Sequence, residues 1–271
     1  MKRALAAAFL LAACHKQPGD AAHEPVKAKR TLDPKQTREA LAKASKWMAQ
    51  FPSSELRFDA AIGLTAIRAH LADPQLDQAL AHAREVANRD GDNPLRAMFD
   101  ADGGRPANTA DWEIPDAGRV NVNRVLAEAV NCAAQGIRPR VLDYVDGAMR
   151  DQGGFQTAHA LWALCIARDR GCLTLAEFNR RAGPLVAELR AAATGQPGTS
   201  SQDLDLYAER ALMLELAGAH DDQVTGWLEA LLKAQSKDGA WGASTDAGTE
   251  PSYYRFHATM TASWALAEAL P

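Results

Sequence analysis

The chain of 271 residues carries no strong charge of either sign. A formal net charge of -4 and a pI of about 6.0 give no field that attracts polyanions, so we do not expect nucleic-acid binding. Beyond the N-terminal segment, no stretch reaches the roughly 18 consecutive apolar residues that a membrane span needs. Alternating runs of β-branched residues are missing too, so we expect no strands.

Several catalytic motifs are also missing. The sequence contains no nucleophile elbow, no P-loop, no dinucleotide-binding glycine pattern and no His-Glu-x-x-His. Cysteines and histidines lack the short spacing of a zinc site, and His159 and Cys165 would lie on opposite sides of one helix. We therefore expect neither a metal nor a cofactor.

The N-terminal segment has a cationic start at residues 1–3, an apolar run at residues 4–13 and then Cys14. It resembles a bacterial lipoprotein signal peptide, which implies cleavage after residue 13, lipidation of Cys14 and anchoring in a membrane. His15 after the cysteine fits an outer-membrane protein that faces the periplasm. Residues 14–34 have no periodicity and are rich in Pro, Gly and Ala, which predicts a flexible tether.

Residues 35–271 are expected to form an all-α domain, because apolar residues recur at three- and four-residue spacing. We predict five helical hairpins. The first helix of each is amphipathic and the second is almost entirely apolar, as in residues 158–167 and 258–267. Apolar helices inside a ring of amphipathic ones form an α/α toroid, which can be incomplete with five pairs. The expected helices cover residues 35–50, 54–71, 75–90, 120–135, 138–150, 156–170, 175–194, 202–218, 221–236 and 254–270.

One repeat motif supports this architecture. Residues 235–241 read Gln-Ser-Lys-Asp-Gly-Ala-Trp and match the pattern Q-x-x-x-G-x-W between an outer and an inner helix. The segment resembles the repeat of the squalene-cyclase and protein-prenyltransferase α/α-toroid superfamily. In that superfamily, the glutamine ties off a helix end and the tryptophan stacks on it, so the motif implies structure and not catalysis.

The resemblance suggests isoprenoid chemistry, but the residues do not support it. Asp203-Leu204-Asp205-Leu206 lacks the second adjacent acid of the cyclase motif D-x-D-D. Aromatic residues make up only 6% of the chain, which is few for a cavity that stabilises carbocations. Isoprenoid chemistry is therefore disfavoured.

Three cysteines remain after Cys14, so at most one internal disulfide can form in an exported chain. Cys132 and Cys165 fall near the ends of adjacent inner helices, whereas a short turn joins Cys165 to Cys172. We favour the pair Cys165–Cys172 over free thiols.

Polar residues of functional types gather where the inner helices begin. Ligands in a toroid bind at this mouth, because the cavity opens there and helix N-termini point toward it. The candidate ligand-binding residues are Arg57, Asn121, Asn123, His159, Asp203, Asp205, Tyr207, Arg210 and Tyr253. Each also has a structural explanation, such as helix capping by Asp203.

The densest group runs from residue 251 to residue 257, and we take Tyr254, Arg255 and His257 as candidate catalytic residues. They could neutralise an acidic sugar and move its protons in a β-elimination, or rim acids could hydrolyse a glycoside. No specific signature establishes catalysis. We therefore expect a lipid-anchored module that binds a ligand or a protein partner in the cell envelope, with a lyase or hydrolase acting on a polar saccharide as the alternative.

Overall fold

A computed structural model describes residues 31–89, 93–99, 122–151, 153–192, 196–242 and 252–270. This part of the chain forms ten α-helices with short turns between them, and it contains no strand. The expectation of an all-α fold is confirmed. None of the described helices is long and apolar enough to span a membrane.

The helices follow the predicted hairpins closely in number and order. Their bounds are α2 (Pro34–Ala49), α3 (Phe58–His70), α4 (Pro74–Arg89), α5 (Val122–Gln135), α6 (Pro139–Tyr144), α7 (Gly154–Asp169), α8 (Leu175–Ala192), α9 (Ser201–Leu216), α10 (Asp222–Ala234) and α11 (Ser252–Glu268). Short helical turns are η2 (Ser53–Glu55), η3 (Pro94–Met98) and the π-helical η5 (Val145–Met149).

Two elements differ from the prediction. The helix expected from residue 54 begins only at Phe58, because Ser53–Glu55 forms a separate turn and Leu56 and Arg57 are extended. The helix expected over residues 138–150 changes to π-helical geometry at Val145.

Side chains at the first residues explain where several helices begin. Asp33 accepts hydrogen bonds from the backbone N–H groups of Lys35 and Gln36, and Pro34 fits the first turn because its missing N–H would have no partner there. Asp221 caps α10 in the same way. Leu32, at the end of the expected tether, is buried against this folded part.

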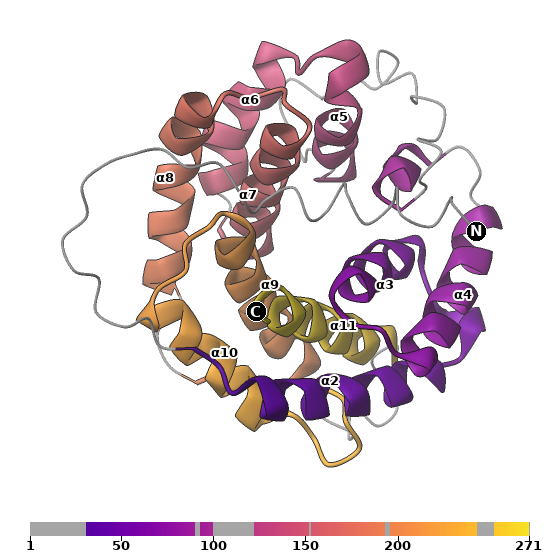
Figure 1. The fold of residues 1–271 in the computed structure, drawn as a ribbon. Coiled ribbons are helices and arrows are strands. Elements are labelled where there is room, and N and C mark those ends of the chain that lie inside the picture. Colours follow the sequence, from indigo (N-terminus) through magenta and orange to yellow (C-terminus); the bar gives the residue numbers. More distant parts are fainter. Residues whose placement is uncertain are drawn as a thin grey trace.

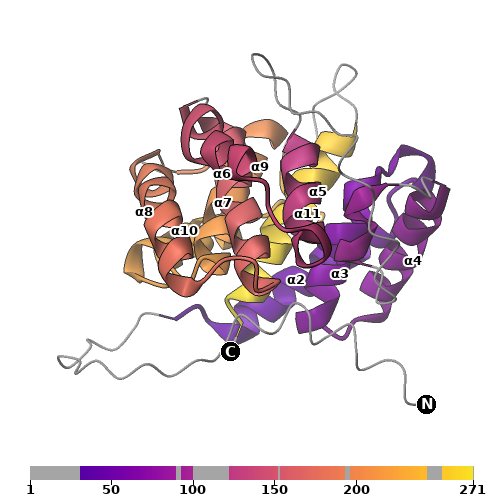
Figure 2. The same ribbon diagram turned by 90° about the horizontal axis from the view of Figure 1, so that it is seen from above.

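The helices fall into two groups in space. Figure 1 shows α2, α4, α6, α8 and α10 at the periphery and α3, α7, α9 and α11 toward the middle. In both ribbon views α11 lies between α9 and α3, and it packs against both (Figures 1 and 2). Alanines on several sides of α11, at positions 258, 262, 265 and 267, are fully buried. Because α11 is buried on several sides, its sequence is apolar on nearly every face.

The turn at residues 235–241 joins the C-terminal helices to the N-terminal one. The Gln235 amide donates to the carbonyls of Ala40 in α2 (2.8 Å) and of Gly239 (2.9 Å). Trp241 is fully buried, and its Nε1 donates to the Leu231 carbonyl (2.7 Å). A glycine is required at position 239, because φ is +97° and a Cβ there would lie 2.6 Å from the Lys43 carbonyl oxygen.

The disulfide differs from the expected one. It joins Cys132 at the end of α5 to Cys172 in the turn after α7, with the Cα atoms 6.1 Å apart. The pairing Cys165–Cys172 is therefore wrong. Cys165 lies within α7 and is buried, whereas Cys172 lies in the turn after α7 and is bonded to α5. The sequence spacing did not reveal that Cys172 lies nearer to Cys132, at the end of α5, than to Cys165 in its own hairpin.

Candidate functional site

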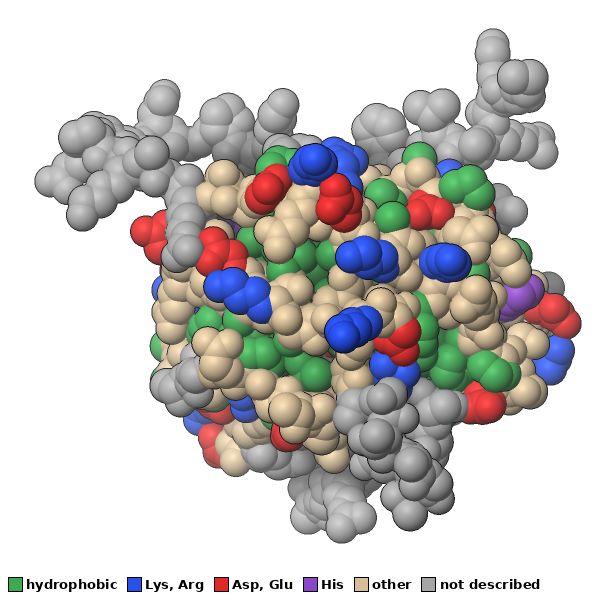
Figure 3. Space-filling view, turned by 90° about the horizontal axis from the view of Figure 1, so that it is seen from below, with side chains coloured by type: hydrophobic (Ala, Val, Ile, Leu, Met, Phe, Trp, Pro, Cys, Tyr) green, Lys and Arg blue, Asp and Glu red, His purple; other side chains and the backbone are tan. Residues whose placement is uncertain are grey.

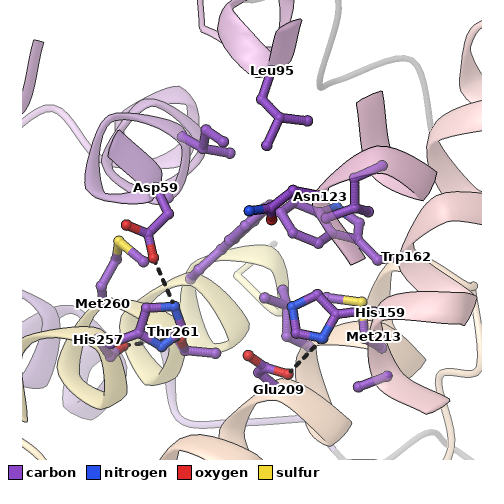
Figure 4. A pocket seen from close by; sticks show the side chains of 16 residues that line it. Asp59, Leu95, Asn123, His159, Trp162, Glu209, Met213, His257, Met260 and Thr261 are labelled. Atoms are coloured by element: carbon purple, nitrogen blue, oxygen red, sulfur yellow. Dashed lines mark hydrogen bonds and ion pairs between the residues drawn. The ribbon is translucent and has the colours of Figure 1, made fainter. Parts of the chain in front are cut away.

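A cavity of about 110 Å³ opens between the middle helices, and we call it the central pocket. Figure 4 shows polar side chains from α3, α5, α7, α9 and α11 facing it together with apolar ones. Its polar lining is Asp59, Asn123, His159, Glu209, His257 and Thr261, and its larger apolar lining includes Ile62, Leu95, Leu126, Trp162, Leu212, Met213, Met260 and Trp264.

His257 of α11 is held between carboxylates from two other helices. Its Nδ1 lies 2.8 and 2.9 Å from the two carboxylate oxygens of Asp205 in α9, and its Nε2 lies 3.4 Å from Asp59 Oδ2 in α3. Tyr253, one turn before His257, donates its hydroxyl hydrogen to Asp59. The Arg57 guanidinium lies over the Tyr253 ring, 4.5 Å from its centre. Three helices are thus connected through one imidazole.

His159 and Glu209 form a second contact on the other side of the pocket. His159 Nδ1 lies 2.7 Å from the Phe155 carbonyl, which can only accept, so Nδ1 carries a hydrogen and Nε2 is left as the acceptor in the neutral ring. Glu209 Oε2 lies 3.7 Å from the same Nδ1, which is too long for a hydrogen bond. Glu209 is only 7% exposed, so its carboxyl group faces the pocket from a buried position.

The surroundings shift the pKa values of these acids in opposite directions. Burial, followed by the charge of Asp205, raises the pKa of Glu209 well above its usual range. Burial also opposes ionisation of Asp59, but the hydrogen bond and charge of His257 and the hydrogen bond from Tyr253 outweigh it and lower the Asp59 pKa. The surroundings therefore favour the protonated form of Glu209 and the ionised form of Asp59.

The pKa values of the two histidines are also shifted in opposite directions. Burial disfavours the imidazolium form of His257, but the charge of Asp205, its hydrogen bond and those of Asp59 raise the His257 pKa well above the usual value. For His159, burial lowers the pKa, and the hydrogen bond to Phe155 offsets this only in part. His257 is a cation and His159 a neutral ring at neutral pH. The pocket therefore presents both proton donors and proton acceptors.

Asp205, Glu209 and His257 each offer an atom within 4.8 Å of the others, and these are residue types that bind divalent cations. The N–H of His257 already lies between the two oxygens of Asp205. We interpret this cluster as a hydrogen-bonded ion pair and not as a metal centre.

The structure brings together six of the residues singled out in the sequence. Asn123, His159 and His257 line the central pocket. Asp205 binds His257 from behind, Tyr253 binds Asp59, and Arg57 lies over the Tyr253 ring. Tyr253 and His257 share a helix face because they are four residues apart.

The other two candidates for catalysis lie elsewhere on α11. Tyr254 is 40% exposed and does not line the pocket. Arg255 binds both carboxylate oxygens of Asp238 (3.0 and 2.9 Å) and the Gly242 carbonyl, and it lies over the Trp47 ring. The Arg255 side chain projects from a different side of the helix than His257. Its bonds to Asp238 and Gly242 connect α11 to the turn after α10.

The remaining ligand-binding candidates also lie away from the central pocket. Asp203 lies in the first turn of α9, where its backbone N–H donates to Ser200 Oγ and its carboxylate accepts from the same hydroxyl group. The helix is therefore capped by Ser200 and not, as expected, by Asp203. Tyr207 is buried beside Trp227, and burial raises its pKa to about 12. Arg210 reaches toward the Ala192 carbonyl at the end of α8. Asn121, the lipidation site Cys14 and the signal peptide lie outside the described residues.

Sequence reasoning missed Glu209, whereas Asp59 was noticed beside Arg57 as a polar residue at the start of an inner helix. A signal for Glu209 was present: it lies four residues after Asp205, and the other residues one turn away on that face, Leu206, Leu212 and Met213, are apolar. The two acids therefore share a buried face. The signal for Asp59 is its place in the first turn of an apolar helix, but its contact with His257 depends on the packing of α3 against α11.

Comparisons with other proteins give no further guide. No match is found among protein-family models, curated proteins or solved structures. The function has to be argued from the pocket itself.

Proposed function

We propose that this chain is a lipid-anchored α/α-toroid protein of the bacterial cell envelope, whose central pocket binds a small polar ligand. Consecutive hairpins place one helix at the periphery and the next toward the middle, and α11 packs on both α3 and α2, which supports a ring. The bond from Gln235 to the Ala40 carbonyl, 195 residues away, further supports closure between the last and the first hairpin.

Export and anchoring rest on the sequence alone. The cationic start, the apolar run and Cys14 are the features that support a lipoprotein signal. Changing Cys14 to Ser should abolish labelling with a radioactive fatty acid and release the protein from membranes, whereas continued labelling would exclude lipidation at this residue.

One observation carries the ligand proposal: titratable side chains from four helices face a single cavity whose other walls are apolar. Such a mixture is typical of sites for small molecules. Trp162 and Trp264 meet edge to face at 5.7 Å between ring centres and form one wall. A sugar ring has an apolar face for such a wall and hydroxyl groups for Glu209 and His159, so we favour a saccharide end that enters the pocket.

One face of the molecule gives no support to a polyanion partner. Figure 3 shows one face of the molecule, on which basic and acidic side chains are interspersed with apolar ones. No single sign dominates that face, which gives no long-range attraction for a highly charged polymer.

Binding can be tested by NMR titration of the protein with a panel of mono- and disaccharides. The variants Trp162→Ala and His159→Ala should weaken binding of any saccharide that binds the wild type. Tyr254→Phe, outside the pocket, is the matched control and should bind normally. A panel without a binder, or a binder that ignores both pocket variants, would exclude saccharide recognition at this site.

A second function is favoured by the opposite pKa shifts in the pocket. Protonated Glu209 can donate a proton to a leaving group, while the neutral His159 ring or the Asp59 carboxylate takes one from water or from the substrate. A proton donor and a proton acceptor in one pocket support a hydrolase or lyase. Turnover of a saccharide that is lost in Glu209→Gln and falls above the Glu209 pKa would establish it, and unchanged turnover in that variant would rule out Glu209 as the acid.

A further inference from the structure

A second cavity, of about 200 Å³, lies away from the central pocket and shares no lining residue with it. It opens between the π-helical turn η5 and helix α8. Its lining is Asp146, Arg150, Arg180, Arg181, Pro184 and Leu185, and we call it the arginine cavity.

The backbone is irregular on both sides of this cavity. On one side, η5 has π-helical geometry, which occurs often at functional sites. On the other side, Pro184 lies inside α8 and has no N–H to donate to the Arg180 carbonyl one turn earlier. Two helices that would otherwise be regular are therefore both interrupted where they face the cavity.

One ion pair crosses the arginine cavity and leaves two buried atoms without partners. Arg181 Nη1 binds Asp146 Oδ2, and the two side chains are 14% and 34% exposed. Within the described part of the chain, Arg181 Nε and Asp146 Oδ1 are buried and have no hydrogen-bond partner. Buried polar atoms are nearly always hydrogen-bonded in proteins. A ligand that satisfies both atoms has to present an acceptor to Arg181 and a donor to Asp146.

The charges around the cavity specify the acceptor. Arg150 and Arg180 add two guanidinium groups to that of Arg181. Arg150 binds the neighbouring Asp151 at 2.9 Å, and the third nearby acid, Glu177, is bound to Thr174. Arginines exceed acids among the lining residues, so the acceptor group is an anion. A carboxylate suits this place because a guanidinium can bind both of its oxygens in parallel.

We propose that the arginine cavity binds a small carboxylate with a hydrogen-bond donor on the adjacent carbon, that is, an α-amino or α-hydroxy acid. The carboxylate lies on Arg181 and its neighbours, and the ammonium or hydroxyl group donates to Asp146 Oδ1. A phosphate dianion fits less well, because its charged oxygens would face the Asp146 carboxylate. This inference is independent of the function proposed for the central pocket.

The test is isothermal titration calorimetry at low ionic strength with four probes: L-alanine, L-lactate, propionate and inorganic phosphate. Propionate is the matched probe that keeps the carboxylate and lacks the donor. We expect alanine or lactate to bind about tenfold more tightly than propionate, the change that one hydrogen bond to a charged group can give. The stronger of the first two probes tells an amino acid from a hydroxy acid.

Two variants and one control connect the binding to the cavity. Arg181→Lys keeps the positive charge beside Asp146 but removes Nε, so binding of the preferred probe should fall about tenfold. Asp146→Asn should reduce the preference for alanine over propionate, because it removes the charge that faces the ammonium group. Arg89→Ala changes an exposed arginine of α4, which pairs only with Glu85 among the contacts of its side chain seen in the structure, and should have no effect.

Four outcomes would overturn the proposal. These are equal binding of alanine, lactate and propionate, tighter binding of phosphate than of any carboxylate, unchanged binding in Arg181→Lys, and no saturable binding of any probe at millimolar concentration. The last result would mean that solvent alone satisfies the two buried atoms. Circular dichroism of each variant establishes that a loss of binding is not a loss of folding.

Discussion

The turn after α10 and the central pocket both contain buried polar groups, but the partners of these groups differ. In the turn, Gln235 and Trp241 donate to backbone carbonyls. In the pocket, His257 and Glu209 face other side chains that can gain or lose protons. A backbone carbonyl does not titrate, so the hydrogen bonds of the turn do not change with pH. The pocket changes with protonation, which makes it suited to binding and to proton transfer.

The largest difference between the two regions is expected for their tryptophans. Trp241→Ala should lower the free energy of unfolding by about 3–5 kcal/mol, because it empties a fully buried site and removes a hydrogen bond. Trp162→Ala, in the wall of the pocket, should cost less than half as much, since that side chain is only partly buried. Urea denaturation of both variants measures this. Equal losses would show that the pocket wall stabilises the fold as much as the turn does.

The free energy of unfolding should depend on pH through His257 in the pocket. The His257 pKa is raised in the folded protein, so its stabilising contribution is fully present below the ordinary histidine pKa of about 6.5 and is lost as pH rises through the folded value. His257→Gln should therefore lose about 1.5–3 kcal/mol at pH 6, and the deficit should shrink at higher pH. Denaturation curves at several pH values measure the difference. A deficit that stays constant with pH would mean that the His257 charge does not matter.

Backbone strain should appear in the turn and not in α10 before it. Gly239→Ala should lower stability by about 1–3 kcal/mol, because alanine is strained at positive φ and its Cβ would press on the Lys43 carbonyl. Gly226→Ala is the matched control: it lies inside α10 with open space around its Cα, and alanine is the better helix former by about 1 kcal/mol. The two variants should thus move the thermal midpoint in opposite directions. A raised thermal midpoint in Gly239→Ala would contradict the close approach of the turn to α2.

The same contrast explains what the sequence could predict. The helices and their order were predictable, because the spacing of apolar residues reports which face of each helix is buried. The local part of the turn was predictable as well, since Gln235 and Trp241 are close in sequence and each donates to a nearby backbone carbonyl. The contacts of Gln235 and Gly239 with α2 were not predictable.

The central pocket was predictable only in part. His257 and Asp205 were singled out as polar residues near helix starts, and they do meet. Tyr254 and Arg255 were grouped with His257 because they are adjacent in sequence, yet adjacent residues of a helix point in different directions. Asp59 reaches His257 only through the packing of α3 on α11. Contacts between distant helices depend on how the helices are placed, and that placement is not encoded in any short segment.

The smallest expected effect separates two buried glutamates of α9. Burial and the charge of Asp205 raise the Glu209 pKa, so the folded wild type loses stability as pH rises above the ordinary value of about 4.5, where the unfolded chain ionises freely. Glu209→Gln avoids this and should gain about 0.5–2 kcal/mol at pH 7, with the gain vanishing toward pH 4. Glu215→Gln is the control, because Glu215 is equally buried but binds His220 Nδ1 at 2.7 Å and should lose stability when neutralised. If both variants were destabilised to the same extent in chemical denaturation at pH 7, Glu209 would be an ordinary paired acid, and the pocket would no longer differ from the rest of the core.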